Sequence, residues 1–249
     1  MSPLKTLSER MLRALNWRAS GRCLLCDANA DNPPLAICSG CEADLPWLGA
    51  HCLVCALPLT HHGLTCGECL KRRPSFARVE APWRYEFPVA SLINRFKHRA
   101  DMPFGRLLAD LLTQHVQHAL DQGLPRPDGL IAVPLSRTRQ RQRGFNQAQM
   151  LSQWLSRQLH IDTLKDVLIR TADAPAQQQL DARSRKRNLR HAFNLHPDAS
   201  VNGLHLALVD DVLTTGATAD TLARLLLRAG ATRVDVYCLA RTPKPGDST

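Results

Sequence analysis

The chain has 249 residues, enough for one large or two modest domains, and 44% of them are hydrophobic, which supports a buried core. Lysine and arginine outnumber aspartate and glutamate by 32 to 22, which gives a formal charge of +10. This excess favours anionic partners such as nucleic acid, an acidic membrane surface or phosphorylated ligands, although a basic surface without such a partner also produces it. Aromatic residues make up only 5% of the chain, which excludes extensive base stacking.

The first twenty residues predict a short amphipathic helix rather than a targeting segment. Charged residues interrupt any apolar core there, which argues against a signal peptide: Lys5, Glu9, Arg10 and Arg13. Four apolar residues fall on one helical face: Leu4, Leu7, Met11 and Leu15. Since no apolar stretch approaches the roughly 18 residues of a membrane span, we expect a cytoplasmic protein without one.

Eight of the nine cysteines form four Cys-x-x-Cys pairs: Cys23 and Cys26, Cys38 and Cys41, Cys52 and Cys55, Cys66 and Cys69. A two-residue gap lets both thiolates face one metal ion, and two such knuckles complete a tetrahedral site. Eight thiolates would therefore hold two structural Zn²⁺ ions. We favour zinc over an iron–sulfur cluster, over disulfides and over thioredoxin-like redox chemistry.

The pairing of the knuckles is open between two arrangements. Sequential use joins the first pair to the second and the third to the fourth, whereas an interleaved ribbon joins the first to the third. We prefer the sequential arrangement because each loop is then short and self-contained. This region should bury little apolar core, so that the metal supplies folding energy. The histidines nearby, His51, His61 and His62, are expected to be exposed, and the isolated Cys238 is expected to be buried.

An α/β pattern begins at Val79. Residues 79–85 predict an edge strand interrupted by Pro82, and residues 91–99 predict a basic helix. Leu92, Ile93 and Phe96 would pack inward, while the polar side chains stay accessible: Arg95, Lys97, His98 and Arg99. Residues 104–120 predict an amphipathic helix.

A short buried strand is predicted over residues 130–133 and a helix over residues 147–159. The segment between them carries arginines at alternate positions: Arg137, Arg139, Arg141 and Arg143. We interpret it as a basic loop that faces an anion, and a merely solvated basic loop is the alternative.

Residues 170–188 show no helical or strand periodicity. They carry three glutamines and a basic cluster, with Arg190 close behind: Arg183, Arg185, Lys186 and Arg187. A loop of this length is usually functional or disordered, and a plain linker is the alternative.

Residues 206–218 form the most informative segment. The apolar run 206–209 ends in Asp210 and Asp211, and a loop with Thr214, Thr215 and Gly216 leads into a helical pattern that extends to residue 228. A helix start offers free N–H groups and about half a positive charge, which attracts phosphate. Carboxylates at the end of a strand lie where open α/β sheets bind ligands. The segment therefore suits a sugar phosphate, and a capped strand–turn–helix with solvated acids is the alternative. With a strand over 234–239 it predicts a right-handed parallel βαβ unit.

These thirteen residues resemble the phosphoribosyl-pyrophosphate signature of type I phosphoribosyltransferases. The rest of the chain is similar to the ComF family, which includes the GntX-like proteins. Four segments, spanning roughly residues 20–242, carry this likeness: the cysteine pairs, residues 91–99, residues 143–147, and residues 170–188 leading into the signature.

The resemblance implies an α/β fold, with an open parallel sheet flanked by helices as in type I phosphoribosyltransferases, preceded by a small cysteine-rich zinc-binding domain. We expect a helix and double zinc-knuckle domain over residues 1–78, a phosphoribosyltransferase-like domain over 79–242, and a mobile tail over 243–249. The resemblance also suggests a link to DNA uptake in bacterial competence, or to the use of DNA as a nutrient. It implies no known substrate.

The resemblance also assigns roles. Asp210 and Asp211 would orient the ribose hydroxyls, and phosphoribosyl pyrophosphate with Mg²⁺ would bind through Leu213, Thr214, Thr215, Gly216, Ala217 and Thr218. Pyrophosphate would contact Arg143, Gly144, Asn146 and Gln147. A flap over it would contribute Gln177, Arg183, Arg187 and Asn188, although the family often has Thr where this chain has Ala174. The basic side chains of residues 95–99 would reach pyrophosphate or nucleic acid, or form a solvated face.

The leading hypothesis is therefore a phosphoribosyltransferase with an unknown base or amine acceptor. The second hypothesis is a non-catalytic module that binds a phosphorylated nucleotide or single-stranded DNA. A third is a zinc-dependent scaffold for a helicase or other competence proteins.

Overall fold

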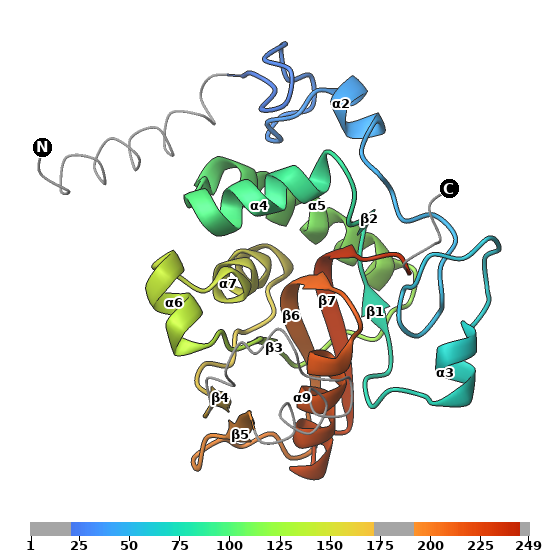
Figure 1. The fold of residues 1–249 in the computed structure, drawn as a ribbon, viewed down its shortest axis with the longest axis vertical. Coiled ribbons are helices and arrows are strands. Elements are labelled where there is room, and N and C mark those ends of the chain that lie inside the picture. Colours follow the sequence, from blue (N-terminus) through green and yellow to red (C-terminus); the bar gives the residue numbers. More distant parts are fainter. Residues whose placement is uncertain (1–20, 172–191, 245–249) are drawn as a thin grey trace, which may run out of the picture.

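A computed structural model describes residues 21–171 and 192–244 (Figure 1). Five strands form one parallel sheet in the order β1-β7-β6-β3, with β2 also paired to β7. Their bounds are β1 Val79–Glu80, β2 Trp83–Arg84, β3 Gly129–Ala132, β6 His205–Leu213 and β7 Arg233–Arg241. A separate antiparallel pair consists of β4 (Leu168–Arg170) and β5 (Phe193–Leu195). Because the five strands are parallel, their carboxyl ends share one edge of the sheet.

Helices cover both faces of this sheet (Figure 1). Three of them, α4 (Val89–Arg99), α5 (Met102–Asp121) and α7 (Gln147–Leu159), pack on the face to which Ala207, Val209 and Tyr237 point. Helix α9 (Ala217–Arg228) packs on the opposite face. The strands are apolar on both faces, as parallel strands between helices must be. None of the helices within the described ranges is long and apolar enough to cross a membrane.

The expected fold class is confirmed, as is most of the expected element order. The edge strand is interrupted at Pro82, with Val79 opposite Val236 and Trp83 opposite Ala240. Leu92, Ile93 and Phe96 are buried on α4, and Cys238 is buried in β7, as expected. The predicted N-terminal helix, and the flap and tail except for their first residues, lie outside the described residues.

Two expectations about local structure were wrong. Strand β6 does not end at Val209 but continues through both acids to Leu213, because its pairing with β7 extends to Arg241. The segment predicted as a basic loop contains a short helix, α6 (Arg137–Arg143), which begins at a capping Ser136 that accepts a hydrogen bond from the N–H of Arg139. This helix buries no residue, so hydrophobic periodicity gives no sign of it.

The cysteine-rich segment contributes to the core of the α/β part. Its two short helices, α2 (Ser39–Ala43) and α3 (Gly67–Lys71), follow the second and fourth knuckles. Leu35, Ile37 and Leu45 join the core on the α4–α5 side. Leu48, Val54 and Leu57 join the core on the α9 side. The region therefore buries more apolar surface than its sequence predicts, in shared cores.

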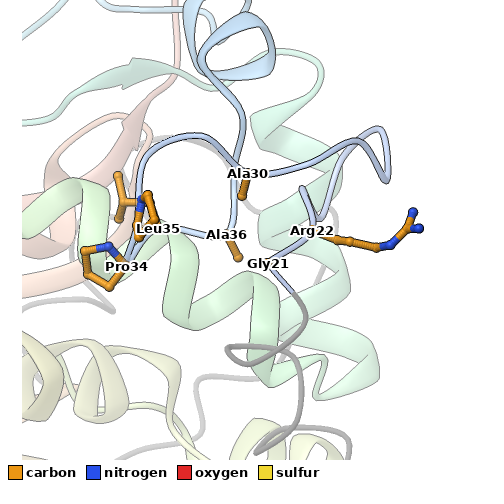
Figure 2. Close-up of a pocket in the computed structure, with 7 residues that line it drawn as sticks. Gly21, Arg22, Ala30, Pro34, Leu35 and Ala36 are labelled. Carbon is orange, nitrogen blue, oxygen red and sulfur yellow. The ribbon is translucent and has the colours of Figure 1, made fainter.

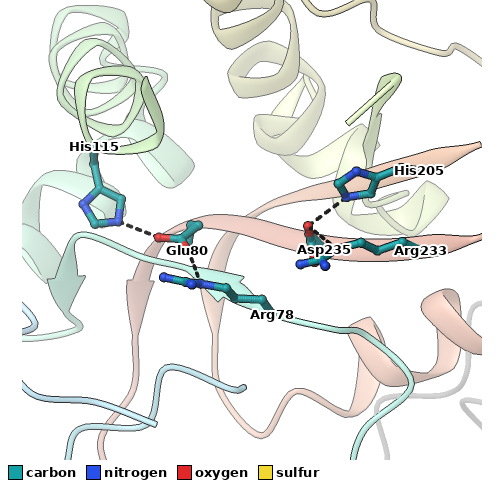
Figure 3. Close-up of polar contacts among 6 residues, drawn as sticks. All are labelled: Arg78, Glu80, His115, His205, Arg233 and Asp235. Atoms are coloured by element: carbon teal, nitrogen blue, oxygen red, sulfur yellow. Dashed lines mark hydrogen bonds and ion pairs between the residues drawn. The ribbon is translucent and has the colours of Figure 1, made fainter. Parts of the chain in front are cut away.

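Two buried acids of the sheet are paired with less buried basic side chains (Figure 3). His205 of β6 lies 2.8 Å from the buried Asp235 of β7, which also pairs with Arg233 at 3.0 Å. On β1, the buried Glu80 pairs with Arg78 at 2.5 Å and with His115 of α5 at 3.1 Å. These two acids are therefore engaged in structural pairs, whereas ligands of open α/β sheets bind at the carboxyl edge.

Candidate functional site

Asp210 and Asp211 lie side by side in β6 at the carboxyl edge of the sheet. Successive residues of a strand point to opposite faces, so Asp211 points toward α4 and Asp210 toward the α9 side. The backbone N–H of Asp211 donates a 2.8 Å hydrogen bond to the Asp210 carboxylate. The two acids thus flank the edge of the sheet, each in a different environment.

The protonation of Asp210 is tuned by this environment. Burial, and then the negative charge of Asp211, raise its pKa from 3.8 to about 7, against the opposing effects of the Asp211 N–H and of Lys97. Near neutral pH this carboxyl is therefore present in both its protonated and its charged form, and a bound cation would favour the charged form.

Lys97 supplies the positive charge beside these acids. Its Nζ atom lies 2.9 Å from Oδ1 of Asp211, and both side chains are only 14% exposed. The sequence placed Lys97 on an accessible face, in a segment of uncertain role. The structure instead directs it into the site, because it lies on the side of α4 that faces β6. Its neighbour Arg95 points elsewhere, stacking 4.0 Å over Phe104 and pairing with Asp101 at 2.8 Å. His98 and Arg99 are exposed.

The loop after β6 has the form expected of an anion site. Leu213 ends the strand, Thr214 and Thr215 are exposed, and Gly216 has a φ of +74°, a left-handed conformation that favours glycine. Ala217 and Thr218 begin α9, whose first turn has N–H groups without intrahelical acceptors. Among the described residues, the N–H of Ala217 alone in this turn has a side-chain acceptor, the Thr215 hydroxyl at 3.3 Å.

The predicted pyrophosphate residues follow strand β3, which is adjacent to β6. The N–H of Val133 donates to the carbonyl of Val209, so the chain leaves β3 next to the two acids. Gly144 ends α6 with a φ of +81°, and Asn146 caps α7 by accepting from the N–H of Ala148 at 3.0 Å.

Gln147 connects these residues to Lys97. Its side chain is buried, accepts a 2.9 Å hydrogen bond from Arg143 and donates a 3.5 Å one to the carbonyl of Lys97. A continuous series of contacts therefore runs from Asp211 through Lys97 and Gln147 to Arg143. Residues 91–99 and 143–147 and the signature over 206–218 meet along it. The predicted flap residues Gln177, Arg183, Arg187 and Asn188 lie outside the described residues.

The eight paired cysteines form two separate tetrads, as sequential pairing predicts. The ligand atoms of Cys23, Cys26, Cys38 and Cys41 lie within 4.8 Å of one another, and so do those of Cys52, Cys55, Cys66 and Cys69. Sγ–Sγ distances of 3.6 Å occur in both tetrads. They match the edge of about 3.8 Å in a tetrahedron with Zn–S bonds of about 2.3 Å. The donor sets thus fit structural zinc, and His51, His61 and His62 belong to neither.

Backbone N–H groups support the thiolate form in each tetrad. Burial raises the pKa of Cys23, but N–H groups of Cys26, Cys38 and Leu25 outweigh it and lower that pKa to about 7. In the second tetrad burial likewise opposes the N–H groups around Cys52, which lower its pKa to about 7. Thiolate is the form that binds zinc.

The hollows at the first tetrad do not compete with the carboxyl edge as a ligand site. Figure 2 shows a small one, bounded by Pro34, Leu35 and Ala36, with the Arg22 side chain turned away from it. A larger, open one lies between the first tetrad and Phe104. Its cations, Arg22 and Arg95, pair with Asp27 and Asp101.

One residue that holds the site was missed in the sequence. Arg241, the last residue of β7, is buried and donates hydrogen bonds to the carbonyls of Leu213 and Thr214. The available signal was its position, since a charged residue that ends the apolar run 236–240 must find partners when buried.

Comparison with known proteins places this arrangement in a family. A family model described as a double zinc ribbon domain matches residues 14–70. The chain is 40% identical over 223 residues to DNA utilization protein YhgH of Escherichia coli (strain K12), which covers 89% of this chain and 97% of that protein. Competence protein F of Haemophilus influenzae is 37% identical over 88% of this chain and 96% of its own length. Competence protein ComFC of Bacillus subtilis is 27% identical, covering 88% and 95%.

Solved phosphoribosyltransferases share a weaker likeness. Purine phosphoribosyltransferase from Pyrococcus horikoshii is 17% identical with a TM-score of 0.35, over 57% of this chain and 77% of that one. Hypoxanthine phosphoribosyl transferase of Trypanosoma cruzi is 14% identical with a TM-score of 0.38, over 58% and 70%. The sheet and helices described above define the fold. The sequence relatives, at about 40% identity over most of their length, show that the chain belongs to the ComF family of competence and DNA utilization proteins.

Proposed function

We propose that this protein binds phosphoribosyl pyrophosphate with Mg²⁺ at the carboxyl edge of its sheet and transfers the phosphoribosyl group to a base or amine. The observation that supports it most is the meeting of two acids, an anion-binding loop and Arg143 around one edge. A phosphorylated sugar with a pyrophosphate group needs these three kinds of contact together. We also propose that the phosphoribosyltransferase-like domain begins after residue 78 and ends at residue 242.

Each set of residues has a task in this reaction. The 5-phosphate binds the N–H groups and hydroxyls of residues 213–218, and Asp210 and Asp211 accept hydrogen bonds from the ribose hydroxyls. The acceptor nitrogen bonds to the anomeric carbon as the bond from that carbon to pyrophosphate breaks. Pyrophosphate leaves with the electron pair, and the acceptor loses a proton. The nearby carboxylates stabilise the cationic ribose, while Arg143 stabilises the leaving group. When bound, Mg²⁺, which prefers oxygen ligands, would neutralise pyrophosphate charge.

The names of the relatives suggest the setting of this activity. DNA utilization and competence proteins share most of the chain's length, so we propose that this protein acts on products of DNA uptake or of DNA used as a nutrient.

A second candidate function is the binding of single-stranded DNA without catalysis. The observation that favours it is helix α6, where Arg137, Arg139 and Arg141 are exposed directly beside the carboxyl edge. A phosphate backbone could follow these side chains and end at the anion loop. A helicase or another competence protein would then be a further partner.

Release of pyrophosphate separates the two functions. Purified protein is incubated with phosphoribosyl pyrophosphate, Mg²⁺ and a panel of nucleobases and simple amines, and free pyrophosphate is measured. Acceptor-dependent release that Asp210→Asn and Asp211→Asn abolish supports the transferase. Absence of release with every acceptor, together with salt-sensitive DNA binding, would support the binding module instead.

A further inference from the structure

A single buried guanidinium connects the second cysteine tetrad to the anion-binding loop. Arg241 is 6% exposed. Its Nε donates a 2.8 Å hydrogen bond to the carbonyl of Cys55, a member of that tetrad. Its Nη1 donates to the carbonyl of Leu213 at 3.1 Å and to that of Thr214. The planar fork of arginine suits this task, because its several N–H groups reach acceptors on different segments at once.

These hydrogen bonds determine where the loop N–H groups point. In a trans peptide the carbonyl and the next N–H point in opposite directions. Because Arg241 draws the carbonyls of Leu213 and Thr214 toward itself, the N–H groups of Thr214 and Thr215 are directed away from it. They therefore point outward from the protein interior, toward the side on which an anion would bind.

The chain that leaves the second tetrad supports the other end of the loop. The N–H of Ser75 donates to the carboxylate of Asp220 in the first turn of α9 at 2.7 Å, and Arg224 pairs with the same carboxylate at 2.6 Å. The buried ring of Phe76 lies beneath Gly216, 3.7 Å from the point where a Cβ would stand. The loop thus contacts the second tetrad's segment on both sides.

The first tetrad is attached to a different part of the molecule. Cys23 packs in the core with Leu35 and Ile37 against α4 and α5. Its knuckle lines a hollow together with Arg95 of α4 and Phe104 of α5, and no residue of the loop lines this hollow. The two tetrads therefore provide a comparison in which the same chemistry is present but only one tetrad contacts the loop.

We propose that Arg241 is a positioning residue through which metal bound at the second tetrad fixes the anion-binding loop, so that loss of this metal weakens anion binding while loss of the first tetrad's metal does not. Metal fixes the backbone of its knuckle, including the Cys55 carbonyl, because the chain wraps around the ion. Without it this carbonyl moves, and the guanidinium no longer holds both segments. The proposal rests on the proposed function only for the identity of the anion.

The test compares Cys69→Ser with Cys41→Ser, each of which removes the last ligand of one tetrad. Elemental analysis should give two zinc ions for the wild type and one for each variant. Hydrogen exchange is then followed at the amides of residues 214–219, with residues 107–112 of α5 as an internal reference. In Cys69→Ser the loop amides should exchange at least about tenfold faster, with the reference unchanged, and affinity for phosphoribosyl pyrophosphate with Mg²⁺ should fall about tenfold. Cys41→Ser should leave both quantities within about twofold of wild type.

Arg241→Lys tests the route of the coupling. One ammonium group cannot span the Cys55 carbonyl and the loop carbonyls, so this variant should keep both zinc ions and yet show the fast loop exchange. Adding Cys69→Ser to it should increase exchange by less than the two separate effects combined, because two changes on one path are not additive.

Three results would overturn the proposal: wild-type loop exchange in Cys69→Ser, equal effects of Cys41→Ser and Cys69→Ser, or additive effects in the double variant. If the exchange pattern appears but the wild type does not bind phosphoribosyl pyrophosphate, the coupling stands and the proposed function fails.

Discussion

Asp210 and Asp211 are neighbours in sequence, yet the strand gives them different chemistry. Asp211 is neutralised by Lys97 at 2.9 Å, whereas burial and the charge of Asp211 keep the pKa of Asp210 near 7. The sequence predicts both acids at the site, because a structural turn has no use for two adjacent carboxylates. It could not predict that the two carboxyls differ in environment, since this difference depends on a lysine more than a hundred residues away on α4.

Asp210 should make the folded protein less stable as pH rises. Its folded pKa exceeds its unfolded value of 3.8, so between about pH 4 and about pH 7 the folded state holds a proton that the unfolded chain has released, and stability is lost through this range and levels off above it. Between about pH 6 and about pH 8 the wild type should lose about 1 kcal/mol more than Asp210→Asn, measured by urea unfolding. Asp44→Asn, which removes an exposed carboxylate, should follow the wild type. Equal pH dependence in wild type and Asp210→Asn would show that Asp210 does not hold its proton.

Lys97→Met should destabilise the fold by about 1–3 kcal/mol, since it leaves Asp211 without its partner in a largely buried position. Adding Asp211→Asn should recover part of the loss, because the unpaired charge is then gone. Chemical denaturation of both variants measures this, and Lys165→Met, at an exposed lysine, is the control. If Lys97→Met is as stable as the control, the ion pair does not contribute to the fold.

At the scale of elements, the sequence predicted the bounds of those helices whose side chains alternate between core and solvent. Helix α7 has the predicted bounds, and α4, α5 and α9 differ by only a few residues, because their buried faces impose periodicity. Helix α6 was missed because it has no buried face. Its signals were the capping Ser136 and the C-terminal Gly144, which act without a core. The length of β6 was underestimated because its acids break the apolar run but not the pairing with β7.

Close packing of α4 on α5 should be sensitive to one methyl group. A Cβ at Gly105 would lie 2.4 Å from the Phe96 ring, so Gly105→Ala forces the two helices apart and should cost about 1–3 kcal/mol. Thermal or urea unfolding measures the loss. Gly67→Ala in α3 is the matched control, because nothing lies within 4 Å of its added Cβ. Gly105→Ala as stable as this control would mean that α4 and α5 are more loosely packed than described.

At the scale of the whole molecule, the cysteine-rich segment and the α/β part are joined more closely than ligand spacing could reveal. Cys-x-x-Cys spacing determines how thiolates gather around a metal, but not what the rest of the segment packs against. Leu35 and Ile37 enter one core and Val54 and Leu57 the other, so the metal sites support both faces of the sheet. Arg241 joins the second tetrad to the site through contacts between residues far apart in the chain.

If DNA is a ligand, arginines at the carboxyl edge of the sheet should contribute more to its binding than arginines near the amino edge. The logarithm of affinity for single-stranded DNA should fall with the logarithm of salt at a slope of about −0.7 per neutralised phosphate. Arg139→Ala with Arg141→Ala, at the carboxyl edge, should make this slope shallower. Arg157→Ala with Arg228→Ala removes the same charge at the ends of α7 and α9, near the amino edge, and should change it less. Equal slopes for both pairs, or no binding at low salt, would remove the support for the DNA-binding function.

The most direct test of the central claim is a calorimetric titration of the protein with phosphoribosyl pyrophosphate, with and without Mg²⁺. The wild type should bind in the presence of Mg²⁺, and Asp210→Asn with Asp211→Asn should weaken that binding at least about tenfold while the protein stays folded. Asp44→Asn with Asp198→Asn removes the same charge at exposed positions and should bind as the wild type does. Wild-type affinity in the Asp210 and Asp211 double variant, or no binding by the wild type with Mg²⁺ present, would contradict a sugar-phosphate site at the carboxyl edge of this sheet.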